Sequence, residues 1–271
     1  MCIAVFLWRC HPLYRFFLLH NRDEYHGRPT EALAWWDGEG GQILGGRDTL
    51  AGGTWLAFSR NGKMAFITNV REIQKIPQAK TRGDLPIRFL QSSKSPWEFA
   101  EEVVKETHLY NGFNLILADF PSGSMVYLTN RLNKESAYIA EVSPGVHVLS
   151  NASLDSPWPK AQRLRDGLGE LLNVYGDGEL PARVMADKLM MNDVKDEDES
   201  LLPGIYTPQF EYQLSSVFVD TDSPLGRYGT RSISALTVKF DWELSFYEKH
   251  LEEEEWKDKT VTFIIEADDR G

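Results

Sequence analysis

A cysteine at the start of the chain and a polar tetrapeptide about twenty positions later are the residues best suited to chemistry. Cys2 follows Met1, so removal of one methionine would place a thiol and a free α-amine on the same residue. A cysteine thiol titrates near pH ~8.5 and an α-amine near pH ~8, so the amine can accept the thiol's proton without a histidine. Cys2 is therefore a candidate N-terminal nucleophile, and the alternative is a small cysteine of the hydrophobic core.

The tetrapeptide Asn21-Arg22-Asp23-Glu24 ends an apolar, strand-like run at residues 16–19. In isolation it is typical of a solvated strand end with an arginine–carboxylate pair. Residues 2–8 predict a strand, residues 10–12 a turn and residues 14–20 an antiparallel return strand. Such a hairpin would place Arg22 and Asp23 beside Cys2, where they can orient the amine and stabilise the thiolate.

Further motifs continue the pattern along nearly the whole chain. In order, they are Met1-Cys2-Ile3, Asn21-Arg22-Asp23-Glu24 with Arg28-Pro29, Gly45-Gly46-Arg47-Asp48, Ala51-Gly52-Gly53-Thr54-Trp55-Leu56, Thr68-Asn69-Val70-Arg71, Ser150-Asn151-Ala152, Pro157-Trp158-Pro159-Lys160 and Tyr228-Gly229-Thr230-Arg231-Ser232. Together they resemble the NRDE family, also called the transport and Golgi organisation protein 2 family. The resemblance implies an N-terminal-nucleophile hydrolase fold and a link to secretory-pathway organisation and to the handling of haem and acyl-CoA lipids.

The chain is similar, more loosely, to the bile-salt and penicillin V acylases. That similarity implies that Cys2 is the nucleophile, that Asp23 holds its amine and that Arg22 is the neighbouring arginine. It also implies that Asn151 donates to the oxyanion and that Arg231 is the late active-site arginine. In the acylases the first arginine and the aspartate are separated in sequence, whereas here they are adjacent.

The predicted fold class is α+β, a four-layer αββα sandwich of two mainly antiparallel sheets, in a single domain over residues 1–271. Asn61-Gly62 between apolar runs predicts a hairpin with a type I′ turn, and Ser95-Pro96-Trp97-Glu98 predicts a helix start with a capping box. The remaining predicted elements are strands at about 113–119, 124–130, 136–141, 146–150, 214–220, 232–240 and 243–248, and helices at about 157–174 and 182–190.

Composition narrows the function classes. The formal net charge of −11 disfavours nucleic acid, because phosphate contacts need clustered Lys and Arg. Charged residues interrupt the apolar runs, so we expect no transmembrane segment and no cleaved signal. Cys2 and Cys10 suit a reducing compartment, and neither has metal-ligand spacing, so we expect no metal site. The expected location is cytoplasmic, with mitochondrial or Golgi association left open.

Two function classes remain. The first is a carrier that binds a small anionic ligand, an acyl-CoA or haem, and it is the interpretation favoured by the family resemblance. The second is a Cys2-dependent hydrolase that cleaves an amide or an acyl thioester, so enzymatic activity stays open. No cofactor is required in either class. The candidate ligand-binding residues are Asn21, Glu24, Arg47, Asn69 and Arg71.

Overall fold

The computed structural model describes residues 2–36, 42–131 and 137–266. Its backbone contacts divide the chain into two compact units. The first unit comprises residues up to Gly27, Pro144–Ser150 and Leu154–Phe263, and the second comprises Arg28–Ser143, Asn151–Ser153 and Ile264 onwards. Each unit contains one sheet with its own helices. The single domain over residues 1–271 stays a prediction.

The sheet of the first unit is antiparallel throughout, in the order β10-β1-β2-β12-β13-β14, with β11 paired to β12. The predicted hairpin of β1 and β2 lies within this sheet, and its two strands are the apolar runs at the start of the chain. The strands are β1 (Cys2–Trp8), β2 (Tyr14–Tyr25), β10 (Gly145–Leu149), β11 (Asp220–Ser223), β12 (Gly226–Lys239), β13 (Glu243–Glu252) and β14 (Glu255–Ile264).

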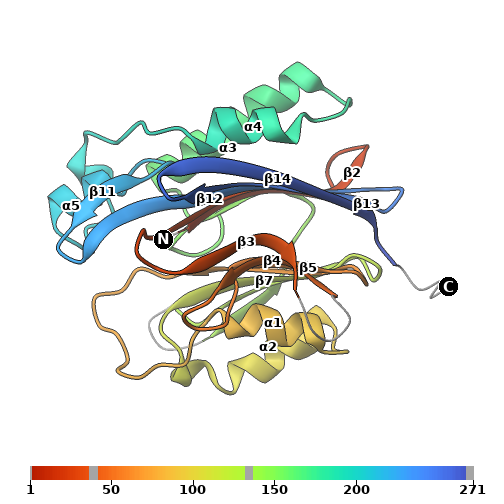
Figure 1. Cartoon of the computed structure of the whole chain (residues 1–271), viewed down its shortest axis with the longest axis horizontal. Coiled ribbons are helices and arrows are strands. Elements are labelled where there is room, and N and C mark those ends of the chain that lie inside the picture. Colours follow the sequence, from red (N-terminus) through yellow and green to blue (C-terminus); the bar gives the residue numbers. More distant parts are fainter. Residues whose placement is uncertain (1, 37–41, 132–136, 267–271) are drawn as a thin grey trace. The chain divides into compact units, whose positions relative to one another are not determined.

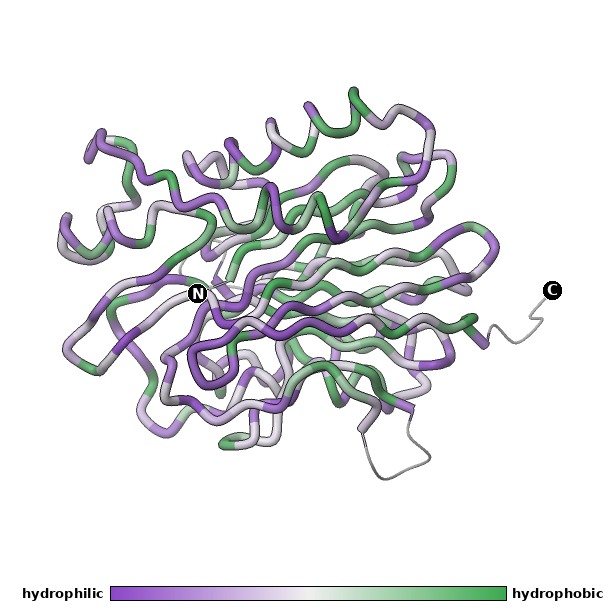
Figure 2. Tube along the Cα trace, turned by 45° about the horizontal axis from the view of Figure 1, so that its top comes forward, coloured by the Kyte–Doolittle hydropathy of each residue, from purple (hydrophilic) through white to green (hydrophobic). Residues whose placement is uncertain are grey.

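Helices α3 (Pro159–Tyr175) and α4 (Ala182–Met190) cover one face of this sheet (Figure 1). Hydrophobic and hydrophilic residues alternate along both helices, as the colours in Figure 2 show. Ile3, Val5 and Leu7, at alternate positions of β1, join Leu164 and Leu168 of α3 in one buried core. Period-two strands and a helix with one apolar face therefore meet, as their sequence patterns require. The short helix α5 (Pro208–Gln213) completes the unit.

The sheet of the second unit is also antiparallel, and its strands follow one another in sequence order from β3 to β9. Helices α1 (Asp84–Gln91) and α2 (Pro96–Val104) lie along one face of it (Figure 1), and Phe89 and Phe99 bring them into a common core. The strands are β3 (Thr30–Trp35), β4 (Ile43–Asp48), β5 (Leu56–Ser59), β6 (Lys63–Asn69), β7 (Phe113–Asp119), β8 (Ser124–Thr129) and β9 (Tyr138–Glu141).

Two local predictions in the second unit have different outcomes. The capping box before α2 is confirmed, because the Ser95 hydroxyl accepts from the Glu98 backbone N–H and the Glu98 carboxylate accepts from the Ser95 N–H. The hairpin of β5 and β6 is also present, but its type I′ turn is wrong. A type I′ turn needs a positive φ at both central residues. Here Gly62 has a φ of +86°, but the φ of Asn61 is not positive. The Gly62 N–H donates to the Ser59 carbonyl instead.

The strand predicted at 214–220 is also wrong. Leu214, Val217 and Val219 are buried there, but residues 214–219 belong to no strand, and the Phe218 N–H donates to the Asn192 carbonyl. The chain enters the sheet only at Asp220, the first residue of β11. The apolar residues of the segment pack into a hydrophobic core without forming strand-to-strand hydrogen bonds. Strands β3, β4, β11 and β14 and helices α1 and α5 were not predicted.

The α+β class with two antiparallel sheets is confirmed. In the described part of the chain, none of the helices has the length and apolar character needed to cross a bilayer.

Candidate functional site

Cys2 is the first residue of β1, and the register places it directly opposite Arg22 of β2. Arg22 in turn lies opposite Ser232 of β12. Residues paired across antiparallel strands project from the same face of the sheet, so these three side chains form one row. The predicted hairpin is therefore confirmed, and it brings the tetrapeptide beside Cys2. Cys2 is 7% exposed and Arg22 is 5% exposed.

Burial raises the pKa of the Cys2 thiol, and the nearby Asp23 carboxylate acts in the same direction. A hydrogen bond from the Asp23 backbone and the charge of Arg22 oppose the rise, but burial dominates because a thiolate loses its hydration in the interior. The resting thiol is therefore protonated at neutral pH. It becomes a nucleophile only when a base removes the proton.

Asp23 is held by β12. The Thr230 hydroxyl donates to Asp23 Oδ1 at 2.8 Å, and the Tyr228 hydroxyl donates to the Asp23 carbonyl at 3.2 Å. Thr230 also accepts from the Val219 N–H at 3.0 Å. Gly229 lies between these two donors, and an alanine Cβ there would be 2.2 Å from the Val219 carbonyl oxygen. Residues 228–230 therefore hold Asp23 in place. The sequence does not reveal this role, because it depends on the pairing of β12 with β2.

Arg231 occupies the bulge between Thr230 and Ser232, where β12 carries one residue more than β2. Its Nη1 donates to the Tyr25 carbonyl at 3.4 Å, and burial lowers the pKa of its guanidinium while the Glu24 carboxylate raises it. Glu24 itself accepts the Tyr25 N–H at 2.9 Å. The structure thus brings Glu24 and Arg231 together at the end of β2, next to the Cys2 row.

Asn21 belongs to the opposite side of the sheet. Its side-chain amide is fully buried and donates to the carbonyls of Met190 at 2.7 Å and Val217 at 3.1 Å. Both donors of the amide are therefore used by the backbone that covers this face. These contacts give Asn21 a structural role, and its role in ligand binding stays a prediction.

Asn69, Arg71 and Asn151 come together in the second unit. Asn151 Nδ2 donates to the Asn69 carbonyl at 2.7 Å, and the Arg71 N–H donates to the Asn151 carbonyl at 2.9 Å. Asn151 follows Ser150, whose hydroxyl in the first unit donates to the Cys2 carbonyl at 3.2 Å. The oxyanion role of Asn151 stays a prediction.

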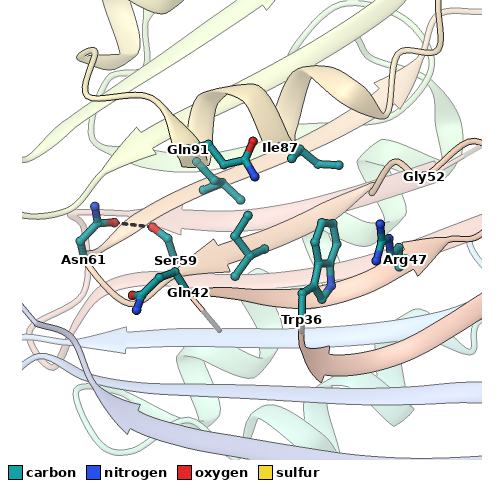
Figure 3. Close-up of a pocket in the computed structure, with 10 residues that line it drawn as sticks. Trp36, Gln42, Arg47, Gly52, Ser59, Asn61, Ile87 and Gln91 are labelled. Carbon is teal, nitrogen blue, oxygen red and sulfur yellow. Dashed lines mark hydrogen bonds between the residues drawn. The ribbon is translucent and has the colours of Figure 1, made fainter. Parts of the chain in front are cut away.

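Arg47 lies on β4 and lines a cavity of the second unit, shown in Figure 3. It shares no hydrogen bond, ion pair or ring contact with Asn69, Arg71 or Asn151 in the described structure. The ligand-binding candidates of the second unit therefore fall into two groups.

Sequence reasoning missed His20, which is fully buried two residues before Arg22 on the same face of β2. It lies opposite Ser234 of β12, and burial lowers the pKa of its imidazole to about 3, so the ring is neutral at neutral pH. The available signal was its period-two spacing from Arg22. Among the residues that the structure describes, no three His, Cys, Asp or Glu side chains gather closely enough to hold a metal ion.

The family model of "Transport and Golgi organisation 2" matches residues 1–253. The transport and Golgi organization 2 homolog of Mus musculus is 32% identical over 288 residues, covering 98% of this chain and 100% of that protein. The homolog of Homo sapiens is 32% identical over 289 residues, with the same coverage.

Among solved structures, a cysteine-to-alanine mutant of the conjugated bile acid hydrolase from Clostridium perfringens aligns with a TM-score of 0.53. It is 10% identical and covers 97% of this chain and 96% of that one. An arginine-to-leucine variant of the same hydrolase has the same TM-score at 11% identity. At such identities the likeness shows the fold alone, and it is the predicted N-terminal-nucleophile hydrolase fold.

Proposed function

The chain belongs to the transport and Golgi organisation 2 family, and on that basis we propose that it binds and carries an anionic lipid-derived ligand, an acyl-CoA or haem, at the Cys2 site. We place this activity in the cytoplasm, with association to the Golgi or to mitochondria. The ligand's phosphates or propionates would meet Arg22.

The observation that supports a carrier is a buried cation beside a protonated thiol. Arg22 keeps its charge in the interior, and its planar guanidinium matches the oxygens of a phosphate or carboxylate in pairs. Cys2, next to it in the row, has its pKa raised by burial, so it adds no negative charge that would repel an anion. A site with these two properties favours anion binding over spontaneous nucleophilic attack.

Arg22→Gln should weaken binding of palmitoyl-CoA or haemin by about tenfold or more, because the loss of a charged hydrogen-bonding partner costs roughly 1.5–3 kcal/mol. Isothermal titration calorimetry with each ligand separately measures the effect and shows which of the two is bound. Arg227→Gln is the matched control, since Arg227 lies on β12 but pairs at the surface with Asp220 and Glu254.

The control variant should bind within about twofold of the wild-type protein. Thermal unfolding of both variants checks that Arg22→Gln remains folded at the titration temperature. Equal affinity in wild type and Arg22→Gln, or no binding of either ligand by the wild-type protein, would contradict the proposed carrier.

A second candidate function is an acyl hydrolase, favoured by the contacts of Asp23. Its backbone hydrogen bond reaches Cys2, and Thr230 anchors its carboxylate close to the start of the chain. After removal of Met1, the Cys2 amine would take the thiol proton, and the sulfur would attack the acyl carbon. The substrate's leaving group, an amine or the CoA thiol, would depart with that proton. Water would then hydrolyse the Cys2 thioester to a carboxylic acid and restore the thiol.

A further inference from the structure

The second unit contains a cavity of about 510 Å³ between helix α1 and strands β4 and β5. This volume falls within the range of roughly 300–1,000 Å³ that small-molecule sites occupy. Figure 3 shows Arg47 and Gly52 at one end, Asn61 and Ser59 at the other, and Trp36 between them. The cavity is therefore elongated, with different chemistry at its two ends.

The cation at one end, Arg47, forms no ion pair with any residue that the structure describes. Arg47 is half-buried, and its contact in the described structure is with the Trp36 ring, whose centroid lies 5.1 Å from the guanidinium carbon. Glu31 is its cross-strand partner, but no ion pair joins the two side chains. In a chain with a net charge of −11, a partly desolvated arginine without a carboxylate is a site where an external anion gains a strong interaction.

Trp36 holds this arrangement in place. Its indole N–H donates to the Gly45 carbonyl at 2.9 Å, and its backbone N–H donates to the Ile43 carbonyl at 2.9 Å. The ring can therefore present one face to the guanidinium without turning away. A cation held over a fixed aromatic ring is pre-organised, which lowers the entropic cost of binding.

Apolar side chains make the walls between the two ends. Ile87 and Leu90 come from α1 and Ile43 from β4, and Ile43 and Leu90 are anchored in the buried core of the unit. At the far end, the Ser59 hydroxyl donates to Asn61 Oδ1 at 2.5 Å, which fixes the amide. The lining thus offers one positive end, an apolar stretch, and neutral polar side chains from Gln42, Ser59, Asn61 and Gln91.

We propose that this cavity binds an elongated monocarboxylate with an apolar chain, its carboxylate on Arg47 and its chain along Ile87 and Leu90. The site is separate from Cys2 and goes beyond the proposed function. A carboxylate fits because the guanidinium can donate two parallel hydrogen bonds to its two oxygens. The apolar chain would end before Asn61, whose amide lines the far end of the cavity.

Octanoate is the probe, and octan-1-ol, with the same chain and no charge, is the matched ligand. Isothermal titration calorimetry should show saturable octanoate binding that Arg47→Gln weakens by about tenfold or more, while Arg47→Lys, which keeps the charge, loses less. Octan-1-ol should bind the wild-type protein more weakly than octanoate, and Arg47→Gln should leave its binding unchanged.

Arg60→Gln is the matched control variant. Arg60 also lies over a tryptophan, Trp35, at 3.9 Å, but it does not line the cavity, so this variant should keep wild-type affinity for octanoate. Cys2→Ala should also keep it, which separates this site from the carrier site. Ile87→Trp, which fills the cavity from an incompletely buried helix position, should abolish binding. Thermal unfolding confirms that each variant is folded.

Equal octanoate affinity in wild type and Arg47→Gln would overturn the proposal. So would equal binding of octanoate and octan-1-ol by the wild-type protein, the absence of saturable octanoate binding, or a loss of binding in Cys2→Ala. Because the carrier test uses Arg22 and different ligands, either proposal can fail while the other stands.

Discussion

Gly229→Ala should lower the free energy of unfolding by about 3 kcal/mol, the upper part of the usual range for overpacking. An alanine Cβ would lie 2.2 Å from the Val219 carbonyl oxygen and 3.0 Å from the Asp220 Cα. Both are backbone atoms, so no side-chain rotation relieves the clash. The shift must disturb the hydrogen bond from the Thr230 N–H to the Val219 carbonyl, which is 2.7 Å long.

Urea unfolding followed by circular dichroism measures this loss. Gly27→Ala is the matched control, because the first unit also contains Gly27 and its added Cβ would meet no atom within 4 Å. The control should change stability by less than about 0.5 kcal/mol. If both glycine variants unfold at the wild-type urea midpoint, the close approach of residue 219 to β12 is not a feature of the molecule in solution.

Asp23→Ala should lower the free energy of unfolding by about 2 kcal/mol, because it leaves the Thr230 hydroxyl buried without its acceptor. Asp23 is 3% exposed, so water cannot replace the lost oxygen. Asp23→Asn retains an oxygen that can accept the Thr230 hydroxyl, and we expect it to lose less than half as much. The two variants therefore separate the hydrogen bond from the charge.

The same urea titration measures both variants. Thr230→Val removes the donor and keeps the shape, so it should lower the free energy of unfolding less in the Asp23→Ala background than in the wild-type protein. Additive losses in that double-mutant cycle would show that Thr230 does not hold Asp23.

The local part of the site was predictable from the sequence. Cys2, the turn at 10–12 and the apolar return strand define an antiparallel hairpin, and its register alone puts Arg22 opposite Cys2. Period-two alternation carries that information within about twenty residues. The support of Asp23 by Thr230 was not predictable, because it joins residues 207 positions apart through the pairing of β2 with β12.

The bulge at Arg231 shows a second limit. One extra residue in β12 changes the face of the sheet from which the side chains after Thr230 project. No residue type in that segment predicts the bulge. Arg47 shows a third, since its cavity depends on α1, a helix of eight residues that the sequence pattern did not predict. Motifs thus identified the residues, while long-range strand pairing and helix placement determined which of them share a site.

The central claim, that the Cys2 site carries a ligand without cleaving it, is tested by titrating palmitoyl-CoA into wild type and Cys2→Ala while free CoA is quantified by chromatography. The protein must first show, by intact mass, that Met1 has been removed, so that a blocked amine does not suppress turnover. We expect both proteins to bind with affinities within about twofold, since the thiol adds little to ground-state binding, and we expect neither to release CoA. Release of CoA by the wild-type protein that disappears in Cys2→Ala, with binding retained, would contradict the carrier and establish the hydrolase.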